Sequence, residues 1–237
     1  MSAEAGDIAA TAKPGQFVMV SCGPELTLRR PLSIHQVTDS RQLCFLFKVM
    51  GKGTSWLSQR HMGESLDLLG PLGNGFSIEP TSSNLLLVAG GIGVAPLIFL
   101  AQRALAEGKS VTLLMGARRA AELYPSQLLP GGIQTAVATE DGSSGTKGMI
   151  TDILPGFVDW ADQIYACGPL TMYQTIATQV QKQHEKKPVQ ISLEVRMGCC
   201  LGACYGCSID TKHGMKQVCR AGPVFDLEEI IWQEVRI

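Results

Sequence analysis

The chain has 237 residues, a formal net charge of −1 and a hydrophobic content of 45 %. This length and composition predict a globular protein with one large domain, or two small domains and an appendage. A nucleic-acid-binding surface requires a basic excess, so we expect no nucleic acid as a partner. The 26 glycines indicate many tight turns or loops that approach a ligand closely.

The apolar run from Leu85 to Ala101 is the only stretch that suggests a membrane span. It is 17 residues long, and three glycines and a proline interrupt it. A bilayer span needs roughly 20 apolar residues, so a strand, a loop and a helix start explain the run better. The start of the chain lacks the basic and apolar regions of a signal peptide. We therefore expect no membrane association and a cytoplasmic location, where thiols stay reduced.

Residues 1–80 are predicted to form β-structure. The segments "GQFVMVSC", "PLSIHQV" and "QLCFLFKVM" are short and apolar, and turn formers such as Pro14-Gly15 separate them. Many short strands without long helices predict a small antiparallel barrel. The first clear strand begins only near Gln16, so a first strand is either missing or weakly encoded.

Residues 81–194 are predicted to form an α/β domain. The apolar segments "NLLLVAG", "SVTLLMGA", "IQTAVATED", "QIYACGP" and "VQISLE" are strand candidates, and helical patterns follow the first and fourth of them. This alternation predicts βαβ units and a parallel sheet covered on both faces. Residues 195–237, with five of the eight cysteines, form a third region.

A glycine loop at Gly90, Gly91 and Gly93 stands between the first of these strands and its helix. Such a loop lets the backbone approach a pyrophosphate at a helix start. The pattern is G-x-G-x-x-P and departs from the Rossmann G-x-G-x-x-G, so a tight turn without a ligand explains it equally well. Cys167-Gly168-Pro169 and "ATEDGSSG" mark two further strand ends, and together the three fit a nucleotide crevice. The second strand ends in the basic stretch "MGARR", and the acidic residue that usually binds the ribose of the cofactor is not evident. The sequence is therefore compatible with both NAD and NADP.

Two further stretches of the β-region are candidates for phosphate binding. In "LRRPLS" an arginine precedes a proline and a hydroxyl, an order suited to a diphosphate, although an ordinary strand entry accounts for it as well. Gly53 and Thr54 stand where backbone N–H groups can meet a phosphate at a helix start.

Cys199, Cys204, Cys207 and Cys219 follow the pattern C-x4-C-x2-C-x11-C. The spacing is that of plant-type [2Fe–2S] proteins, in which a loop of small residues wraps the cluster. Zinc sites prefer two C-x2-C pairs or a Cys/His mixture, and His213 keeps zinc open as an alternative. Cys200 adjoins the first ligand and is an alternative to it, although the spacing favours Cys199.

From about Pro14 onward the chain resembles the electron-transfer subunits of NAD-linked (type B) dihydroorotate dehydrogenases, within the ferredoxin-reductase-like flavoprotein superfamily. The matching stretches are "LRRPLSI", "GKGTSWLS", "LGPLGNGF", "GGIGVAPL", "CGP", "SLEVRMGCCLGACYGC" and "VCRAGPVF". The cysteine segment followed by "GPVF" is the most specific of them. Two departures stand out: the family usually has an additional strand before the position of Pro14, and Cys200 stands where the family commonly has glycine.

The resemblance implies an FAD-binding barrel, a nicotinamide-binding α/β domain and a C-terminal [2Fe–2S] loop. The residues implied to bind FAD are Arg30, Pro31, Leu32, Ser33, Leu46, Phe47, Lys48, Gly53 and Thr54. Those implied to line the nicotinamide crevice are Gly91, Gly93, Cys167 and Gly168. The implied cluster ligands are Cys199, Cys204, Cys207 and Cys219.

The resemblance also implies an electron relay in pyrimidine biosynthesis. An FMN-containing catalytic subunit oxidises dihydroorotate, and the electrons pass through the cluster and FAD to NAD⁺, in a heterotetramer with two copies of each subunit. No residue of this chain is then expected to act as a catalytic acid or base. One alternative is a related iron–sulfur reductase subunit of the ferredoxin:NADP oxidoreductase, hydrogenase or sulfite reductase type. Another is a zinc-stabilised, nucleotide-binding regulatory module.

Overall fold

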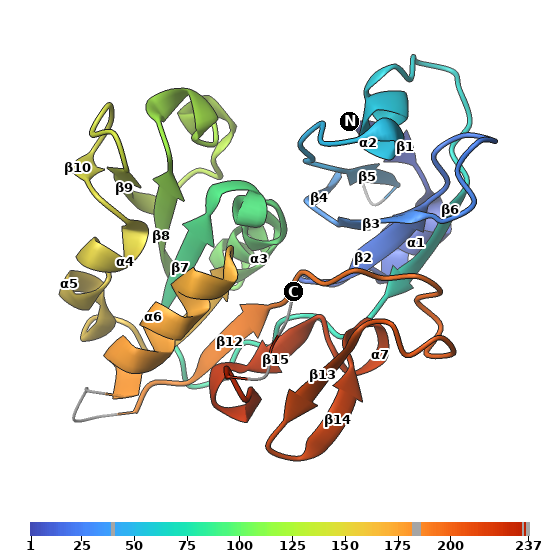
Figure 1. The fold of residues 1–237 in the computed structure, drawn as a ribbon. Coiled ribbons are helices and arrows are strands. Elements are labelled where there is room, and N and C mark those ends of the chain that lie inside the picture. The colour runs from blue at the N-terminus through green and yellow to red at the C-terminus, as the bar shows by residue number, and fades with distance from the viewer. Residues whose placement is uncertain (39–40, 182–185, 234, 236–237) are drawn as a thin grey trace.

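The computed structural model describes residues 1–38, 41–181, 186–233 and 235. Figure 1 shows an N-terminal β-rich part, a central sheet flanked by helices, and a C-terminal hairpin beneath them. In the described part of the chain, no helix is long and apolar enough to cross a bilayer.

The N-terminal part consists of two antiparallel sheets of three strands each. The first sheet has the order β1 (Ser2–Glu4), β5 (Gln42–Cys44), β4 (Gln36–Thr38), and the second has the order β3 (Arg30–Ser33), β2 (Phe17–Val20), β6 (Leu68–Leu72). Two short helices, α1 (Gly6–Thr11) and α2 (Lys52–Ser58), belong to the same part. Their shared core includes Val18, Val20, Ile34, Leu43 and Leu57, so these short strands are held together mainly by burial of aliphatic side chains.

The strand predictions need correction at two places in this part. Strand β1 shows that a strand precedes Gln16 but is weakly encoded, which is one of the two alternatives stated above. The segment "QLCFLFKVM" is a strand only as far as Cys44. "PLSIHQV" divides into β3 and β4, which belong to different sheets. The division has a backbone cause: the N–H of Ile34 donates to Gln16, whereas the N–H of His35 donates to Cys44 of the other sheet.

The central sheet has seven strands in the order β10-β9-β8-β7-β11-β12-β15. In chain order they are β7 (Asn84–Gly90), β8 (Ser110–Ala117), β9 (Gln134–Thr139), β10 (Thr146–Lys147), β11 (Gln163–Cys167), β12 (Val189–Ser192) and β15 (Val224–Asp226). All neighbours from β10 to β12 are parallel, as predicted, but β15 runs antiparallel to β12. The sheet is therefore mixed, because the C-terminal region supplies its last strand.

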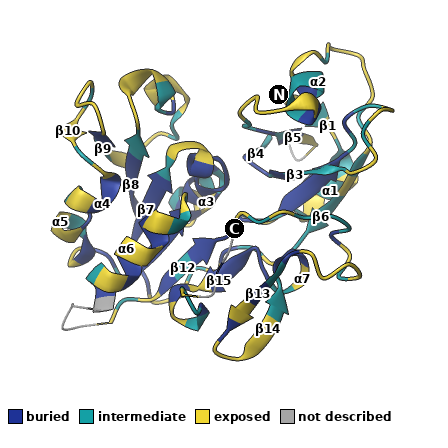
Figure 2. Ribbon diagram, viewed as in Figure 1, coloured by how far each residue is buried: buried dark blue, intermediate teal, exposed yellow. Residues whose placement is uncertain are grey.

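Helices cover both faces of this sheet, as the alternation predicts. Helix α3 (Val94–Ala106) packs on one face, and α4 (Ile150–Ile153), α5 (Pro155–Val158) and α6 (Leu170–Gln181) pack on the other. Figure 2 shows the central strands almost wholly buried between these layers. Three-residue 3-10 turns occur at Gly91–Gly93, Ala120–Glu122, Ser126–Leu128 and Leu227–Glu229.

The C-terminal region forms the hairpin β13 (Ser208–Thr211) and β14 (Gly214–Gln217), followed by α7 (Val218–Ala221) and β15. Its buried residues share one apolar core with β12 and α6. The cysteine loop before β13 is thus fixed to the edge of the central sheet through β15.

Candidate functional site

A cavity of about 340 Å³ lies where the barrel, the glycine loop and the segment after β12 meet. Seven of the residues expected to bind FAD line it: Pro31, Leu32, Ser33, Leu46, Phe47, Lys48 and Thr54. The opposite wall comes from Ile92, Ala95 and the stretch from Ser192 to Val195, with Met197 and Pro223. A mostly apolar cavity with a few polar groups at a domain boundary is typical of a cofactor site.

Arg30 and Gly53 do not line this cavity but contact each other beside it. A Cβ atom on Gly53 would lie 3.1 Å from both Cγ and Nε of Arg30. The guanidinium group of Arg30 is also fixed, because its Nη1 donates to the carbonyl oxygen of Leu28 at 2.7 Å. Thr54, the third residue of α2, accepts hydrogen bonds from the N–H groups of Met50 at 2.9 Å and Gly51 at 3.2 Å. These contacts order the loop before α2 against the strand that carries Arg30.

The glycine-marked ends of β7 and β11 lie against each other. A Cβ atom on Gly93 would overlap the carbonyl oxygen of Cys167, and one on Gly168 would lie 3.0 Å from Cα of Gly90. Gly91 has a φ of +55° and open space around its Cα. The carboxyl ends of two adjacent parallel strands therefore form an edge of the sheet that is lined by backbone atoms. Such an edge is where α/β sheets bind nucleotides.

The Cys167 thiol faces away from this edge. It is 1 % exposed, and its hydrogen-bond partners are the side chains of Tyr173 and Ser192. Burial raises the pKa of this thiol well above its ordinary value. The hydroxyl of Tyr173 accepts a bond from the N–H of Gly168 at 2.9 Å and donates to the carbonyl oxygen of Ser192 at 2.6 Å. Cys167 thus offers a ligand its backbone and not its sulfur.

Backbone N–H groups of the cysteine loop point at cysteine sulfurs. Sγ of Cys199 accepts from Leu201 at 3.4 Å and from Cys204 at 3.3 Å. Sγ of Cys204 accepts from Gly206, and Sγ of Cys207 accepts from Cys219, both at 3.5 Å. The bonds to Cys199 lower the pKa of its thiol to about 6. Amides aimed at sulfur stabilise thiolate, the form that binds iron.

The four candidate ligands form two pairs. The thiol of Cys199 hydrogen-bonds with that of Cys204, and the thiol of Cys207 with that of Cys219. In the described ranges, no group of three or more His, Cys, Asp or Glu side chains is placed to hold a single metal ion. Two thiolate pairs fit a binuclear [2Fe–2S] cluster, which four cysteines hold.

Cys200 packs against two methionine side chains. It is buried, and its Sγ lies 3.1 Å from Sδ of Met19 and 3.5 Å from Sδ of Met197. Burial raises the pKa of this thiol to about 12. The residue has a φ of +54°, a left-handed conformation that favours glycine. The left-handed backbone at position 200 therefore explains why glycine, the residue common in the family, is suited to this position.

Residues 194–231 match the family model for the iron–sulfur cluster binding domain of dihydroorotate dehydrogenase B. A dihydroorotate dehydrogenase B (NAD(+)) electron transfer subunit from Desulforamulus reducens is 40 % identical, over 98 % of this chain and 92 % of its own length. The corresponding subunit from Bacillus caldolyticus is also 40 % identical, over 92 % of this chain and 87 % of its own length. The chain belongs to this family.

Solved structures show the same fold. The structure of an NADH-dependent reduced ferredoxin-NADP oxidoreductase matches with a TM-score of 0.87 and 29 % identity, over 98 % of this chain and 84 % of that one. A ferredoxin NADP⁺ reductase from Neisseria gonorrhoeae matches with a TM-score of 0.60 and 14 % identity, over 78 % of this chain and 89 % of that one. The predicted family and the predicted ferredoxin-reductase-like fold are confirmed. The roles of the individual site residues stay predictions.

Glu194 is a residue of the cavity that sequence reasoning missed. It follows β12 and lines the cavity beside Ser192 and Leu193. The side chain is exposed at the open side of the cavity, and partial desolvation raises the pKa of its carboxyl group. Lys48, the other ionisable residue of the lining, has an ion pair with Glu122 at 3.7 Å. The strand "VQISLE" locates Glu194, but only packing shows which way it faces.

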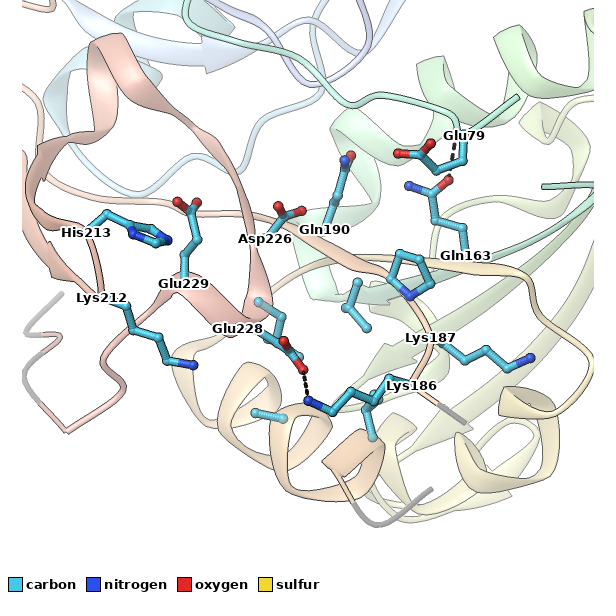
Figure 3. Close-up of a pocket in the computed structure, with 15 residues that line it drawn as sticks. Glu79, Gln163, Lys186, Lys187, Gln190, Lys212, His213, Asp226, Glu228 and Glu229 are labelled. Carbon is cyan, nitrogen blue, oxygen red and sulfur yellow. Dashed lines mark hydrogen bonds and ion pairs between the residues drawn. The ribbon is translucent and has the colours of Figure 1, made fainter. Parts of the chain in front are cut away.

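A second cavity, of about 530 Å³, lies at the opposite edge of the sheet, where β11 and β12 begin. Figure 3 shows side chains of both charges around it, with an ion pair between Lys186 and Glu228 at 3.4 Å. His213 lines this cavity, and none of the four candidate cysteine ligands does. His213, the residue that made zinc an alternative, therefore lines a different cavity from the cysteine site.

Proposed function

We propose that this chain is the electron-transfer subunit of a type B dihydroorotate dehydrogenase. Electrons that an FMN-containing catalytic subunit takes from dihydroorotate reach NAD⁺ through a [2Fe–2S] cluster and FAD held by this chain. FAD supplies the conversion between one-electron and two-electron chemistry. A cytoplasmic location, where the thiols stay reduced, is part of this proposal.

One observation carries the proposal: the cysteine loop and the cavity share a wall. Cys200, next to the candidate ligand Cys199, contacts Met197 at 3.5 Å, and Met197 lines the cavity. A cluster in the loop and a flavin in the cavity would therefore lie on neighbouring parts of the same segment. Such closeness is what electron exchange between two cofactors requires.

Each part of the chain has a role in this proposal. The cavity residues and Arg30 hold FAD, while the backbone of Gly91, Gly93, Cys167 and Gly168 lines the nicotinamide site. Cys199, Cys204, Cys207 and Cys219 hold the cluster. The protein contributes placement and electrostatics, so none of its residues acts as an acid or a base.

The cysteine loop also carries the surface we assign to the catalytic subunit. Leu201 is 62 % exposed and Tyr205 is 60 % exposed, and both lie between candidate ligands. Neighbouring exposed apolar side chains mark protein contacts where they form a patch, and a large aromatic residue often dominates the binding energy. We propose that the catalytic subunit covers them, in an assembly with two copies of each subunit.

An anaerobic absorption spectrum of the purified chain, before and after NADH, tests the proposal. We expect flavin bands and a broad iron–sulfur shoulder that both bleach with NADH. The isolated chain should oxidise NADH with artificial acceptors and should not oxidise dihydroorotate. Dihydroorotate oxidation by the isolated chain would contradict the proposal. A preparation that contains zinc and stays colourless after reconstitution with iron, sulfide and FAD would support the regulatory alternative.

The second candidate function is a subunit of an NADH-dependent ferredoxin:NADP oxidoreductase. The structural match at a TM-score of 0.87 favours it, whereas the identity of 40 % favours the dihydroorotate enzyme. The partner distinguishes the two. Dihydroorotate-dependent NAD⁺ reduction after addition of a dihydroorotate dehydrogenase catalytic subunit supports the first function, and a complex with a ferredoxin-dependent subunit supports the second.

A further inference from the structure

His35 connects the N-terminal barrel with the nicotinamide-binding part. It lies at the corner between β3 and β4 and is 6 % exposed. Its backbone N–H donates to the carbonyl oxygen of Cys44 at 2.9 Å, which fixes it to the barrel. On the other side, Nδ1 lies 2.9 Å from the carbonyl oxygen of Ala95, and Nε2 lies 3.0 Å from the hydroxyl of Tyr124. One side chain thus bonds to two points across the boundary.

Together with burial, these distances fit one neutral tautomer of the ring, in which the Tyr124 hydroxyl donates to Nε2 at 3.0 Å and not to the carbonyl oxygen of Leu128 at 3.4 Å. A carbonyl oxygen only accepts hydrogen bonds, so Nδ1 carries the proton toward Ala95. Burial lowers the pKa of His35, which leaves the ring neutral at pH 7 and Nε2 an acceptor for the Tyr124 hydroxyl. The two rings meet edge to face, with centroids 5.4 Å apart. Both ring nitrogens are therefore satisfied in a single tautomer.

The hydrogen bond from His35 to Ala95 holds the segment that runs from the glycine loop to the flavin cavity. Ala95 lies two residues after Gly93 and lines the flavin cavity together with Ile92. Ser33, two residues before His35, lines the opposite wall of the same cavity. Side chains interlock nearby, since Phe99 of α3 packs against the barrel core. The His35 ring therefore sets the distance between the glycine loop and the strand assigned to flavin.

We infer that His35 and Tyr124 are positioning residues that hold the nicotinamide-binding loop against the flavin strand. Hydride transfer depends on the hydrogen bonds of His35 to Ala95 and Tyr124, which we call the bracket. The inference rests on the proposed function. Hydride transfer needs reacting atoms about 3–3.5 Å apart, and a displacement of about 1 Å costs on the order of 100-fold in rate. A bracket that reaches across the boundary is a direct means of keeping that distance.

Stopped-flow measurement of flavin reduction by NADH, normalised to bound FAD, tests the inference in the purified holo-protein. Tyr124→Phe removes only the hydroxyl, and His35→Asn keeps a donor near Ala95 but is too short to reach Tyr124. We expect each variant to slow flavin reduction about tenfold at saturating NADH. The double variant should be no slower than the slower single one, because both changes break the same bond.

Tyr165→Phe is the matched control. Tyr165 is a buried tyrosine whose hydroxyl donates to the carbonyl oxygen of Ser77 at 3.0 Å, and it does not line the flavin cavity. Its loss should lower the thermal midpoint as Tyr124→Phe does and leave flavin reduction unchanged. If Tyr124→Phe and His35→Asn lose stability like this control and keep the wild-type rate, the residues are merely structural and the inference is overturned.

Ring ¹⁵N NMR of the wild-type protein supplies a readout that does not depend on turnover. We expect a neutral His35 ring with the proton on Nδ1, and a change at Nε2 in Tyr124→Phe. A charged ring or the opposite tautomer at pH 7 would remove the basis of the bracket. If the wild-type flavin is not reduced by NADH at all, the proposed function fails and the positioning role falls with it, while the NMR spectrum still reports whether the bracket exists.

Discussion

Gly93 and Cys167 approach so closely that a Cβ atom on the glycine would overlap the carbonyl oxygen of the cysteine. The two residues are far apart in the chain and stand at the carboxyl ends of the adjacent strands β7 and β11. Their contact closes one side of the edge that we assign to the nicotinamide cofactor. Its geometry leads to the first prediction.

Gly93→Ala should weaken NADH binding. The added methyl group forces the loop away from the Cys167 backbone, and we expect KM for NADH to rise more than about tenfold, with iron and FAD content retained. Gly156→Ala is the control, because a Cβ atom there has no neighbour within 4 Å. An unchanged KM in Gly93→Ala would show that this edge does not bind the cofactor.

Gly53→Ala should weaken FAD binding through Arg30. The new Cβ atom lies 3.1 Å from two side-chain atoms of Arg30, so the guanidinium must shift. We expect the Kd for FAD, measured by flavin fluorescence, to rise about tenfold, which corresponds to about 1.4 kcal/mol. Gly51→Ala, with open space and an extended backbone, should bind FAD normally. Equal affinities for the two variants would remove Arg30 from the FAD site.

Cys199→Ser and Cys200→Ala should differ in iron content. Cys199 receives two backbone N–H groups and pairs with Cys204, so its loss should abolish the iron–sulfur absorption. Cys200 packs on Met19, and its loss should cost about 1 kcal/mol of stability with iron retained. Iron and sulfide analysis separates the two results. Loss of iron in Cys200→Ala, with iron kept in Cys199→Ser, would exchange the two roles.

Asp162→Ala should lower the free energy of unfolding and change its pH dependence. The carboxylate accepts the N–H groups of Ser83 and Asn84 at 2.8 Å each, and these bonds lower its pKa. Because the group is largely exposed, we expect a loss of only about 1 kcal/mol at pH 7. A carboxyl group with a lowered folded pKa stabilises the fold above its ordinary pKa, and this stabilisation disappears as the pH falls through the folded value. The difference between variant and wild type in urea unfolding should therefore shrink as the pH falls below the ordinary carboxyl pKa of about 4. A constant difference at all pH values would contradict this account.

Leu201→Asp should weaken the complex with the catalytic subunit. A charge placed on an apolar contact leaves an unpaired group in the interface, and we expect the Kd to rise at least about tenfold. Met62→Asp is a suitable control, since Met62 is wholly exposed on the barrel side of the molecule. Analytical ultracentrifugation of the mixed subunits measures both. Unchanged association of Leu201→Asp would move the interface away from the cysteine loop.

Local patterns predicted the central strands and helices well. Asn84–Gly90, Ser110–Ala117 and Gln163–Cys167 are strands where continuous apolar runs indicated them, because a strand buried on both faces needs such a run. The barrel was less predictable. Its strands are three to five residues long, and the break at His35 depends on which neighbouring strand supplies each hydrogen-bond partner.

Local sequence accounts for the cysteine spacing, the glycine-marked strand ends and the family, since each depends on residues near one another in the chain. Only the packing of the whole chain shows which of two adjacent cysteines contacts methionine sulfurs, where β15 is added, and that Glu194 lines the cavity. It also shows that His35 bonds to Ala95, 60 residues away, and to Tyr124, 89 residues away. Such contacts follow from the packing of whole layers against one another, and no local pattern of residues specifies them.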